Sequence, residues 1–414
     1  MRPDNQNPGT AVRRVAIVTP AWPPGGSPNG VVTYVVGLRA GLSAVGIESR
    51  VFTPNPGESV GSDVVDVRKF GPSPFIGAAC RLYESFTRRR IDPWWRGRRL
   101  AAALRHTLRD THLDLLEMEE SLGTAWHLRR RSSLPIVVRL HGPWLAVAPA
   151  MGLTRDANCI RREHAEGRAI KAADGVSSPS RHCLQQVREH YGIDLPDAEV
   201  IPNPTAIPEP GSGWTYDSCD KRSILFVGRF DRLKGGDIVI DAFKQIAEER
   251  PEAELIFVGM DRGVVDGAGR TRSLAEYLSD RLSPAQIARV HQLGQQPQSS
   301  IGELRRKALV TIVASRFESF SMTALEALSF GCPLVASDVG GIPEIVVDEE
   351  NGLLFKDGDS TGLARQVLRI FRDPQLAQRL GKHGARDAAE RYAPTVVGRQ
   401  TGAFYARVCA KGRG

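Results

Sequence analysis

The chain has 414 residues, of which 41% are hydrophobic and 25% charged, as is typical of a soluble globular protein with two domains. No apolar run approaches the roughly 20 residues that a membrane-spanning helix needs, and the polar segment Met1 to Val12 predicts a disordered start rather than a secretory signal. Six scattered cysteines without a CxxC pair argue against a zinc site or a disulfide framework, and they favour a cytoplasmic location.

The formal net charge is +8, and the excess of basic residues gathers in the first half of the chain. It is densest in Arg88–Arg99 and Arg129–Arg131. No nucleic-acid-binding motif accompanies these residues, so nucleic acid is not an expected partner. Trp94 and Trp95 lie within the first basic stretch, which leaves two interpretations. The stretch either contacts a membrane surface peripherally, at the inner membrane, or forms a solvated helix with its tryptophans in the core.

Strands and helices alternate throughout, which predicts an α/β protein with two parallel sheets, each covered by helices. After a disordered segment 1–12, we expect a first domain over residues 13–205. Its predicted strands are Val15–Thr19, Ser49–Thr53, Asp114–Met118, Ile136–Leu140, Gly175–Ser178 and Val200–Pro202.

A stretch rich in proline and glycine, residues 206–221, is the predicted linker, and a second domain follows over residues 222–393. Its predicted strands are Ile224–Val227, Leu255–Val258, Val290–Leu293, Leu309–Ala314, Leu334–Ala336 and Gly352–Phe355. Its predicted helices are Gly236–Glu249, Ser299–Lys307, Met322–Ser329, Thr361–Arg372 and Pro374–Glu390. The last segment, residues 394–414, is apolar at helical spacing.

The segment after the buried strand Leu309–Ala314 combines two carboxylates with the start of a helix. Glu318 lies in the loop, Ser321 is a good N-cap for Met322–Ser329, and Glu326 lies about one turn inside that helix. Free backbone N–H groups at a helix N-terminus attract phosphate, and carboxylates attract hydroxyl groups. A ligand that carries both, such as a nucleotide sugar, is therefore expected here.

Glu318 and Glu326 resemble the Glu-x7-Glu signature of family 4 retaining glycosyltransferases. Three further segments match the same family in the expected order: Asn29-Gly30, His141-Gly142 and Gly228–Gly235. The resemblance spans nearly the whole chain. It implies the GT-B architecture, in which two Rossmann-like domains face each other across a cleft and the last segment crosses back onto the first domain. It also implies transfer of a sugar from a nucleoside diphosphate to a hydroxyl acceptor.

The resemblance assigns roles to particular residues. Arg229 and Lys234, which follow a strand end, would stabilise the leaving diphosphate without a metal ion or other cofactor. Glu326 would bind the ribose, and Glu318 and His141 the donor sugar. The remaining expected donor contacts are Gly30, Leu293, Phe320, Ser321, Met322 and Thr323, largely through backbone groups. No nucleophile for a double displacement stands out, so attack on the same face of the sugar is expected, with the leaving phosphate taking the acceptor proton.

The chain departs from the family pattern at Ser321, where glycine is usual, and a serine side chain there could crowd the donor sugar. Asn29-Gly30 likewise replaces the usual glycine pair. Asp357-Gly358-Asp359 matches a metal-binding DxD motif, but Asp-Gly is common in turns and the motif lies far from the others. We therefore expect no metal site there.

Two alternatives remain open: a sugar-nucleotide epimerase or hydrolase of the same fold, and a non-catalytic protein that binds a sugar nucleotide. A dinucleotide dehydrogenase is disfavoured because no GxGxxG motif with a downstream acidic residue is present.

Overall fold

The structure is a computed structural model that describes residues 12–24, 29–58, 61–71, 92–267 and 269–411. Most of the expected disordered start, residues 1–11, lies outside the described residues. Val12 was included in that prediction, but it is buried in the core of the first domain.

The first domain is built on a seven-stranded sheet in the order β3-β2-β1-β4-β5-β6-β7, and all neighbouring strands are parallel. Its strands are β1 (Arg14–Val18), β2 (Glu48–Thr53), β3 (Val64–Asp66), β4 (Leu115–Glu119), β5 (Ile136–Arg139), β6 (Gly175–Ser178) and β7 (Glu199–Val200). The sequence did not predict β3, because three residues are too few to show a period.

Helices cover both faces of this sheet, as expected for parallel strands. The helices are α1 (Gly30–Ala44), α3 (Asp92–Thr107), α4 (Thr124–Arg129), α5 (Trp144–Ala150), α6 (Ala157–Ala172) and α7 (Arg181–Tyr191). One core cluster joins the sheet to α3, α4, α6 and α7. A second cluster joins it to α1 and to α15 (Pro394–Lys411), the last helix of the chain.

The second domain contains a six-stranded parallel sheet in the order β12-β9-β8-β13-β14-β15. Its strands are β8 (Asp220–Val227), β9 (Glu254–Val258), β12 (Val290–Gly294), β13 (Ala308–Val313), β14 (Leu334–Ser337) and β15 (Leu353–Phe355). A two-stranded antiparallel hairpin of β10 (Val264–Val265) and β11 (Thr271–Arg272) was not predicted from the sequence.

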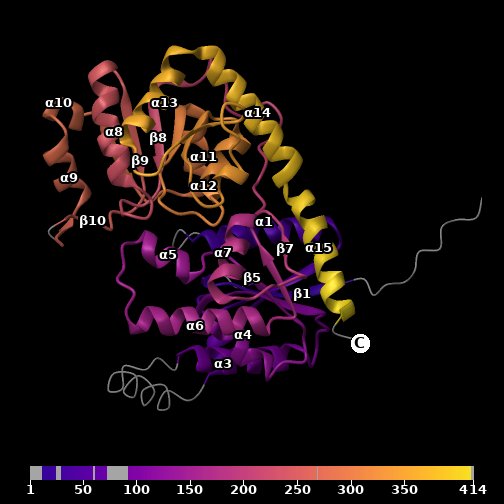
Figure 1. Ribbon diagram of the computed structural model, residues 1–414. Helices are drawn as coiled ribbons and strands as arrows, with labels where there is room; N and C mark the ends of the chain where they lie inside the picture. The colour runs from indigo at the N-terminus through magenta and orange to yellow at the C-terminus, as the bar shows by residue number, and fades with distance from the viewer. Residues whose placement is uncertain (1–11, 25–28, 59–60, 72–91, 268, 412–414) are drawn as a thin grey trace, which may run out of the picture.

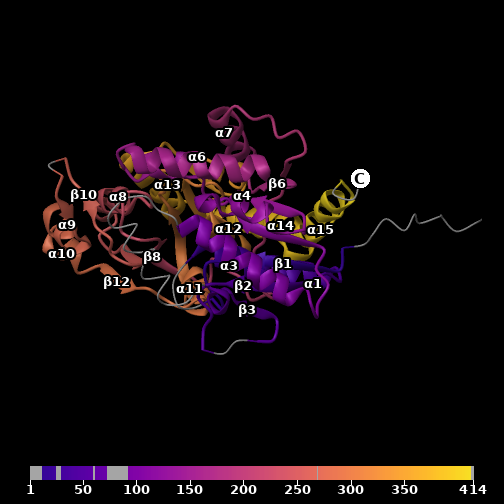
Figure 2. The ribbon, with the colours of Figure 1, turned by 90° about the horizontal axis from the view of Figure 1, so that it is seen from below.

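The helices of the second domain are α8 (Gly236–Glu249), α9 (Leu274–Arg281), α10 (Pro284–Ile287), α11 (Gln298–Lys307), α12 (Met322–Phe330), α13 (Ser360–Arg372) and α14 (Pro374–Tyr392). The core cluster that contains α8 and α13 is separate from the cluster that contains α12 and the end of α14. Figure 2 shows that this domain extends past the first on the side of α9 and α10.

Two segments connect the domains. Residues 201–219 lead from β7 to β8, and β8 already includes Asp220 and Lys221 from the end of the predicted linker. The second connection is α15, which runs down beside α1 of the first domain (Figure 1). Its Tyr405 hydroxyl donates a hydrogen bond of 2.7 Å to the buried Glu117 of β4. The last helix therefore belongs to the core of the first domain, although the chain reaches it from the second.

The domains also touch near the end of β6. The Ser180 hydroxyl donates a hydrogen bond of 2.7 Å to the Ser319 carbonyl oxygen of the second domain. The backbone N–H groups of Arg181 and His182, at the start of α7, each donate a bond of 2.9 Å to the carboxylate of Glu344. Because Ser319 lies next to the predicted donor loop, this contact links the domain interface to that loop.

Candidate active site

The loop between β8 and α8 brings Lys234 to the carboxyl end of β13. Gly235 in this loop has a φ of +69°, and a Cβ atom there would lie 1.9 Å from the carbonyl oxygen of Ala314. Only glycine allows this approach. The Lys234 ammonium group donates a hydrogen bond of 2.6 Å to Oε1 of Glu318, which also accepts one of 2.7 Å from the Ser315 hydroxyl. Two predicted site residues, 84 positions apart, are therefore in direct contact.

Arg316 fastens the same two loops together. Its backbone N–H donates to the Leu233 carbonyl oxygen at 2.9 Å, and its guanidinium donates to both carboxylate oxygens of Asp237, at 2.8 and 2.7 Å. Neither Arg316 nor Asp237 was singled out from the sequence. The acidic residue in the first turn of α8 is an ordinary helix feature, so no sequence signal would have identified the pair.

Arg229 lies beside Lys234 but has a carboxylate partner of its own. Its Nε donates to Oδ2 of Asp231 at 2.5 Å, and Oδ1 of Asp231 accepts the Lys234 backbone N–H at 2.8 Å. The Arg229 and Lys234 side chains are 37% and 29% exposed, so an anionic ligand can reach both. Asp231, which the sequence analysis missed, orders the loop that carries both cations.

The N-terminus of α12 faces this loop from the end of β13. Ser321 is the N-cap, as predicted, and its buried hydroxyl accepts a hydrogen bond of 3.3 Å from the Ala324 N–H. The hydroxyl is therefore turned toward the helix backbone, and the expected crowding of the donor sugar by this side chain stays a prediction. Within the described residues, the backbone N–H groups of Ser321, Met322 and Thr323 have no hydrogen-bond partner. Phe320, just before them, is buried against Tyr392 with ring centroids 5.9 Å apart.

Glu326 projects from α12 toward α11 and is held at both oxygens. Oε1 accepts a hydrogen bond of 2.7 Å from the side chain of Gln298, and Oε2 accepts one of 2.5 Å from the guanidinium of Arg305. Arg305 is fully buried. The sequence predicted Glu326 but neither of its partners.

A cavity of about 580 Å³ lies at the carboxyl ends of β9 and β12. Its lining includes Gly259, Gln292 and Gly294. Leu293, the predicted backbone contact for the base, does not line it, and its carbonyl oxygen accepts a hydrogen bond of 2.6 Å from the Gln296 side chain. The neighbours of Leu293, rather than Leu293 itself, therefore border this cavity.

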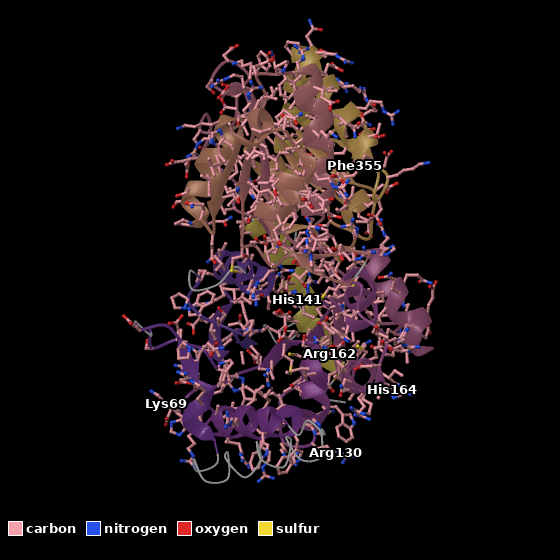
Figure 3. The ribbon with its side chains drawn as sticks, turned by 90° about the vertical axis from the view of Figure 1, so that its left-hand side faces the viewer. Lys69, Arg130, His141, Arg162, His164 and Phe355 are labelled. Carbon is pink, nitrogen blue, oxygen red and sulfur yellow. The ribbon has the colours of Figure 1, made fainter. Side chains whose placement is uncertain are left out.

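His141 follows β5 in the first domain and lies toward the second domain (Figure 3). Its ring packs edge-on against Tyr34 of α1, with centroids 4.8 Å apart. Burial, and secondarily the charge of Arg139, lowers the pKa of His141 to about 3. The imidazole is therefore neutral at pH 7. One of its ring nitrogens can then donate a hydrogen bond and the other can accept one.

Two buried carboxylates hold the loop of His141. Glu120 accepts hydrogen bonds from the backbone N–H groups of His141, at 3.1 Å, and Gly142, at 2.9 Å. Glu166 of α6 accepts one of 2.8 Å from the Trp144 N–H. Burial, reinforced by the charge of Glu166, raises the pKa of Glu120 to about 8. Neither of these carboxyl groups was singled out from the sequence.

Gly30 opens α1, where Asn29 caps the helix by accepting the Val31 N–H at 2.9 Å. A Cβ atom on Gly30 would have no heavy atom within 4 Å. The position that a side chain on Gly30 would occupy is therefore open among the described residues, which exclude residues 25–28 of the preceding loop.

Among the residues with a described position, no group of three or more His, Cys, Asp or Glu side chains could hold a metal ion. Asp359 of the DxD-like motif caps α13, accepting the Gly362 N–H at 2.7 Å. The motif therefore has the turn role expected of it. In the same part of the chain, no helix is long and apolar enough to cross a membrane.

Sequence comparison relates both halves of the chain to known families. The family described as "Glycosyl transferases group 1" matches residues 218–387, and "Glycosyltransferase Family 4" matches residues 28–207. A D-inositol 3-phosphate glycosyltransferase of Streptomyces bingchenggensis is 26% identical, with 96% of this chain and 90% of that protein covered. A phosphatidyl-myo-inositol mannosyltransferase of Mycobacterium leprae is also 26% identical, with 93% and 95% covered.

Solved structures with the same fold include sucrose-phosphate synthase from Thermosynechococcus elongatus, with a TM-score of 0.71 and 22% identity over 96% of this chain and 100% of that one. Anabaena HepE in complex with UDP-glucose has a TM-score of 0.62 and 18% identity over 96% and 99% of the two chains. These structures confirm the predicted architecture of two parallel-sheet α/β domains. The chain belongs to the family 4 glycosyltransferases and is a glycosyltransferase of the GT-B fold.

Proposed function

We propose that the protein is a retaining glycosyltransferase that moves a sugar from a nucleoside diphosphate sugar to a hydroxyl acceptor without a metal ion. The observation that carries this proposal is the 2.6 Å contact between Lys234 and Glu318, next to the unpaired N–H groups at the start of α12. A cation and free amides suit a diphosphate, and a carboxylate suits the hydroxyl groups of a sugar.

Each part of the donor has a counterpart in the second domain. Arg229 and Lys234 bind the diphosphate together with the amides of α12, and Glu326 accepts the ribose hydroxyls. The base enters the cavity beside β12. HepE, which has the same fold, is described as a complex with UDP-glucose, and this supports a uridine diphosphate sugar as one candidate donor.

The chemistry follows from where charge develops. Departure of the nucleoside diphosphate places negative charge on phosphate oxygens, and fixed cations and amides stabilise that charge. Glu318 steadies the positive charge that grows on the anomeric carbon, while the neutral His141 orients a sugar hydroxyl. The acceptor attacks on the face that the diphosphate leaves, and the leaving phosphate takes the acceptor proton. With two cations and a helix N-terminus available, this route needs no metal ion.

The names of the relatives support a class of acceptor. They are transferases acting on inositol 3-phosphate or phosphatidyl-myo-inositol, so a phosphate-bearing polyol is a reasonable acceptor for the first domain.

The direct test incubates the purified protein with UDP-, GDP- and ADP-sugars, each with inositol phosphate and a panel of other hydroxyl acceptors, in buffer containing EDTA. We expect acceptor-dependent release of nucleoside diphosphate and a product whose anomeric configuration, measured by NMR, equals that of the donor. Inversion would refute the retaining mechanism, and loss of turnover in EDTA that Mg²⁺ restores would refute metal independence. Release of nucleoside diphosphate without acceptor would favour a hydrolase, conversion of the donor to an epimeric sugar nucleotide would favour an epimerase, and binding without turnover would favour a non-catalytic binder.

We also propose that the enzyme works in the cytoplasm and contacts the inner membrane surface through Arg88–Arg99. Residues 88–91 lie outside the described residues, but α3 carries exposed Arg98, which stacks over the half-buried Trp94 at 4.7 Å. A cation beside a tryptophan suits the boundary between lipid headgroups and water. Sedimentation with anionic vesicles, but not with neutral ones, is expected, and loss of binding in Arg98→Glu would localise the contact. Equal sedimentation with both vesicle types would contradict the proposal.

A further inference from the structure

The proposed roles do not explain why two side chains of a neighbouring helix hold the Glu326 carboxylate. Glu326 lies on α12, while the two groups that bind it, Gln298 and Arg305, lie at opposite ends of the neighbouring helix α11. Each carboxylate oxygen accepts one hydrogen bond from α11. A carboxylate oxygen can accept about two, so each oxygen keeps one acceptor position free.

Arg305 is an unusual residue for this place. It is among the largest fully buried side chains of the described structure, and a buried charge is costly unless it is paired. Its only salt bridge in the described part of the chain is to Glu326, whose side chain is 13% exposed. Its Nε and Nη1 atoms are buried without a hydrogen-bond partner among these residues.

We propose that Arg305 and Gln298 are positioning residues that fix the Glu326 carboxylate as an acceptor for two adjacent ribose hydroxyls, and so make the enzyme select ribonucleotide over deoxyribonucleotide donors. The inference rests on the proposed function, because it takes Glu326 as the ribose contact. With both oxygens anchored from one side, the carboxylate cannot rotate, and its remaining lone pairs are presented together. A vicinal diol, with two hydroxyl donors side by side, matches this arrangement.

A merely structural salt bridge would behave differently. Removing it would lower the stability of the protein and weaken the binding of all nucleotides equally, whether or not they carry ribose hydroxyls. If α11 orients Glu326, removing a hydrogen bond from Arg305 or Gln298 should instead reduce the affinity that each ribose hydroxyl contributes. Selectivity between matched nucleotides therefore separates the two roles, whereas stability alone does not.

The experiment measures the dissociation constants of UDP, GDP and ADP and of their 2′-deoxy and 2′,3′-dideoxy forms by isothermal titration calorimetry. The proteins are the wild type, Arg305→Gln, Arg305→Lys, Gln298→Ala and the control Arg306→Gln. Arg306 adjoins Arg305 on the same helix but stacks on Phe330 rather than contacting Glu326. Gln298 is exposed, so its variant tests the proposal even if Arg305→Gln does not fold.

For the wild type and Arg306→Gln we expect loss of both hydroxyls to weaken binding of the preferred nucleotide by on the order of 10²- to 10⁴-fold, as for two hydrogen bonds to a charged group. In Arg305→Gln and Gln298→Ala that ratio should fall to within about threefold, and Arg305→Lys should recover part of it. Variants that keep the full wild-type ratio would overturn the inference while leaving the proposed function intact. A wild type that binds none of UDP, GDP and ADP would overturn the donor-binding part of the proposed function and this inference with it.

Discussion

At the scale of single residues, the cations of the site are paired before any donor arrives. Lys234 bonds Glu318 at 2.6 Å and Arg229 bonds Asp231 at 2.5 Å. Pairing keeps the side chains ordered and limits the cost of partial burial. A nucleoside diphosphate that bound here, as proposed, would meet cations whose geometry is already set, and fixed charges of this kind contribute most to stabilising a transition state.

Replacing Lys234 with alanine should therefore lower kcat by on the order of 10²–10³-fold, because a charge partner of the leaving diphosphate is lost. Steady-state kinetics with the best donor would measure this. Lys221→Ala, which removes a lysine at the start of β8, is the matched control and should leave kcat unchanged. Wild-type turnover in Lys234→Ala would remove Lys234 from the mechanism.

Glu120 should give the stability of the protein a distinct pH dependence. Its pKa is about 8 in the folded protein, against an ordinary value of 4.5, so between these pH values the folded state holds a proton that the unfolded state has released. The free energy of unfolding should therefore fall as the pH rises from about 5 to 8, by up to about 4 kcal/mol from this group. Glu120→Gln should lack that part of the decline in urea unfolding series. Parallel curves for the two proteins would contradict the prediction.

At the scale of elements, the sequence predicted the strands that position the site and failed where a pattern was too short or resembled a solvated surface. Apolar runs identified β8 and β13, and the rule that ligands bind at strand ends drew attention to Lys234 and Glu318. The strands β3, β10 and β11 have only two or three residues each, too few for a period.

The buried charged residues that hold the site were not predicted from the sequence, for a different reason. Arg162 and Glu166 are four residues apart on α6 and look like an exposed surface pair, yet Glu166 is buried beneath Trp144. Arg305 lies among three consecutive basic residues at the end of α11, where cations are common. Burial of a charged residue depends on the packing of distant elements, so a local pattern cannot predict it.

The loop between β8 and α8 approaches the end of β13 closely at Gly235. Gly235→Ala should destabilise the protein by roughly 2–4 kcal/mol, because the added Cβ combines a left-handed backbone with a clash against Ala314. Gly192→Ala is the control, since Gly192 also has a positive φ, +59°, but open space around it, and should cost only about 1 kcal/mol. Urea unfolding would compare them, and equal losses would show that the close approach of the loop to β13 is unimportant.

At the scale of the whole molecule, the relative placement of the domains depends on a small polar contact close to the donor loop. Glu344 binds the first two N–H groups of α7, and Ser180 binds the carbonyl oxygen of Ser319. A carboxylate at a helix N-terminus is stabilised by the helix dipole as well as by its hydrogen bonds. The orientation of the first domain is thereby tied to a residue adjacent to Glu318.

Glu344→Ala should weaken the contact between the domains, because it removes the acceptor of the Arg181 and His182 N–H groups, without unfolding either domain. Hydrogen exchange at the Arg181 and His182 amides should accelerate by on the order of tenfold or more, and the radius of gyration from small-angle scattering should increase. Glu350→Ala removes an exposed carboxylate of the same domain and should change neither quantity. Unchanged exchange in Glu344→Ala would mean that other contacts hold the interface.

The path of α15 has a consequence for how the protein is made. Val397, Phe404, Tyr405 and Val408 fill one side of the first domain's core, yet the ribosome adds them only after the whole second domain. The second domain is complete in sequence before them, so it is free to fold while the first still lacks a wall and Glu117 still lacks the Tyr405 hydroxyl. We therefore expect the usual order, in which the amino-terminal domain matures first during translation, to be reversed, and a nascent chain stalled before residue 394 should expose an unfinished first domain beside a finished second one.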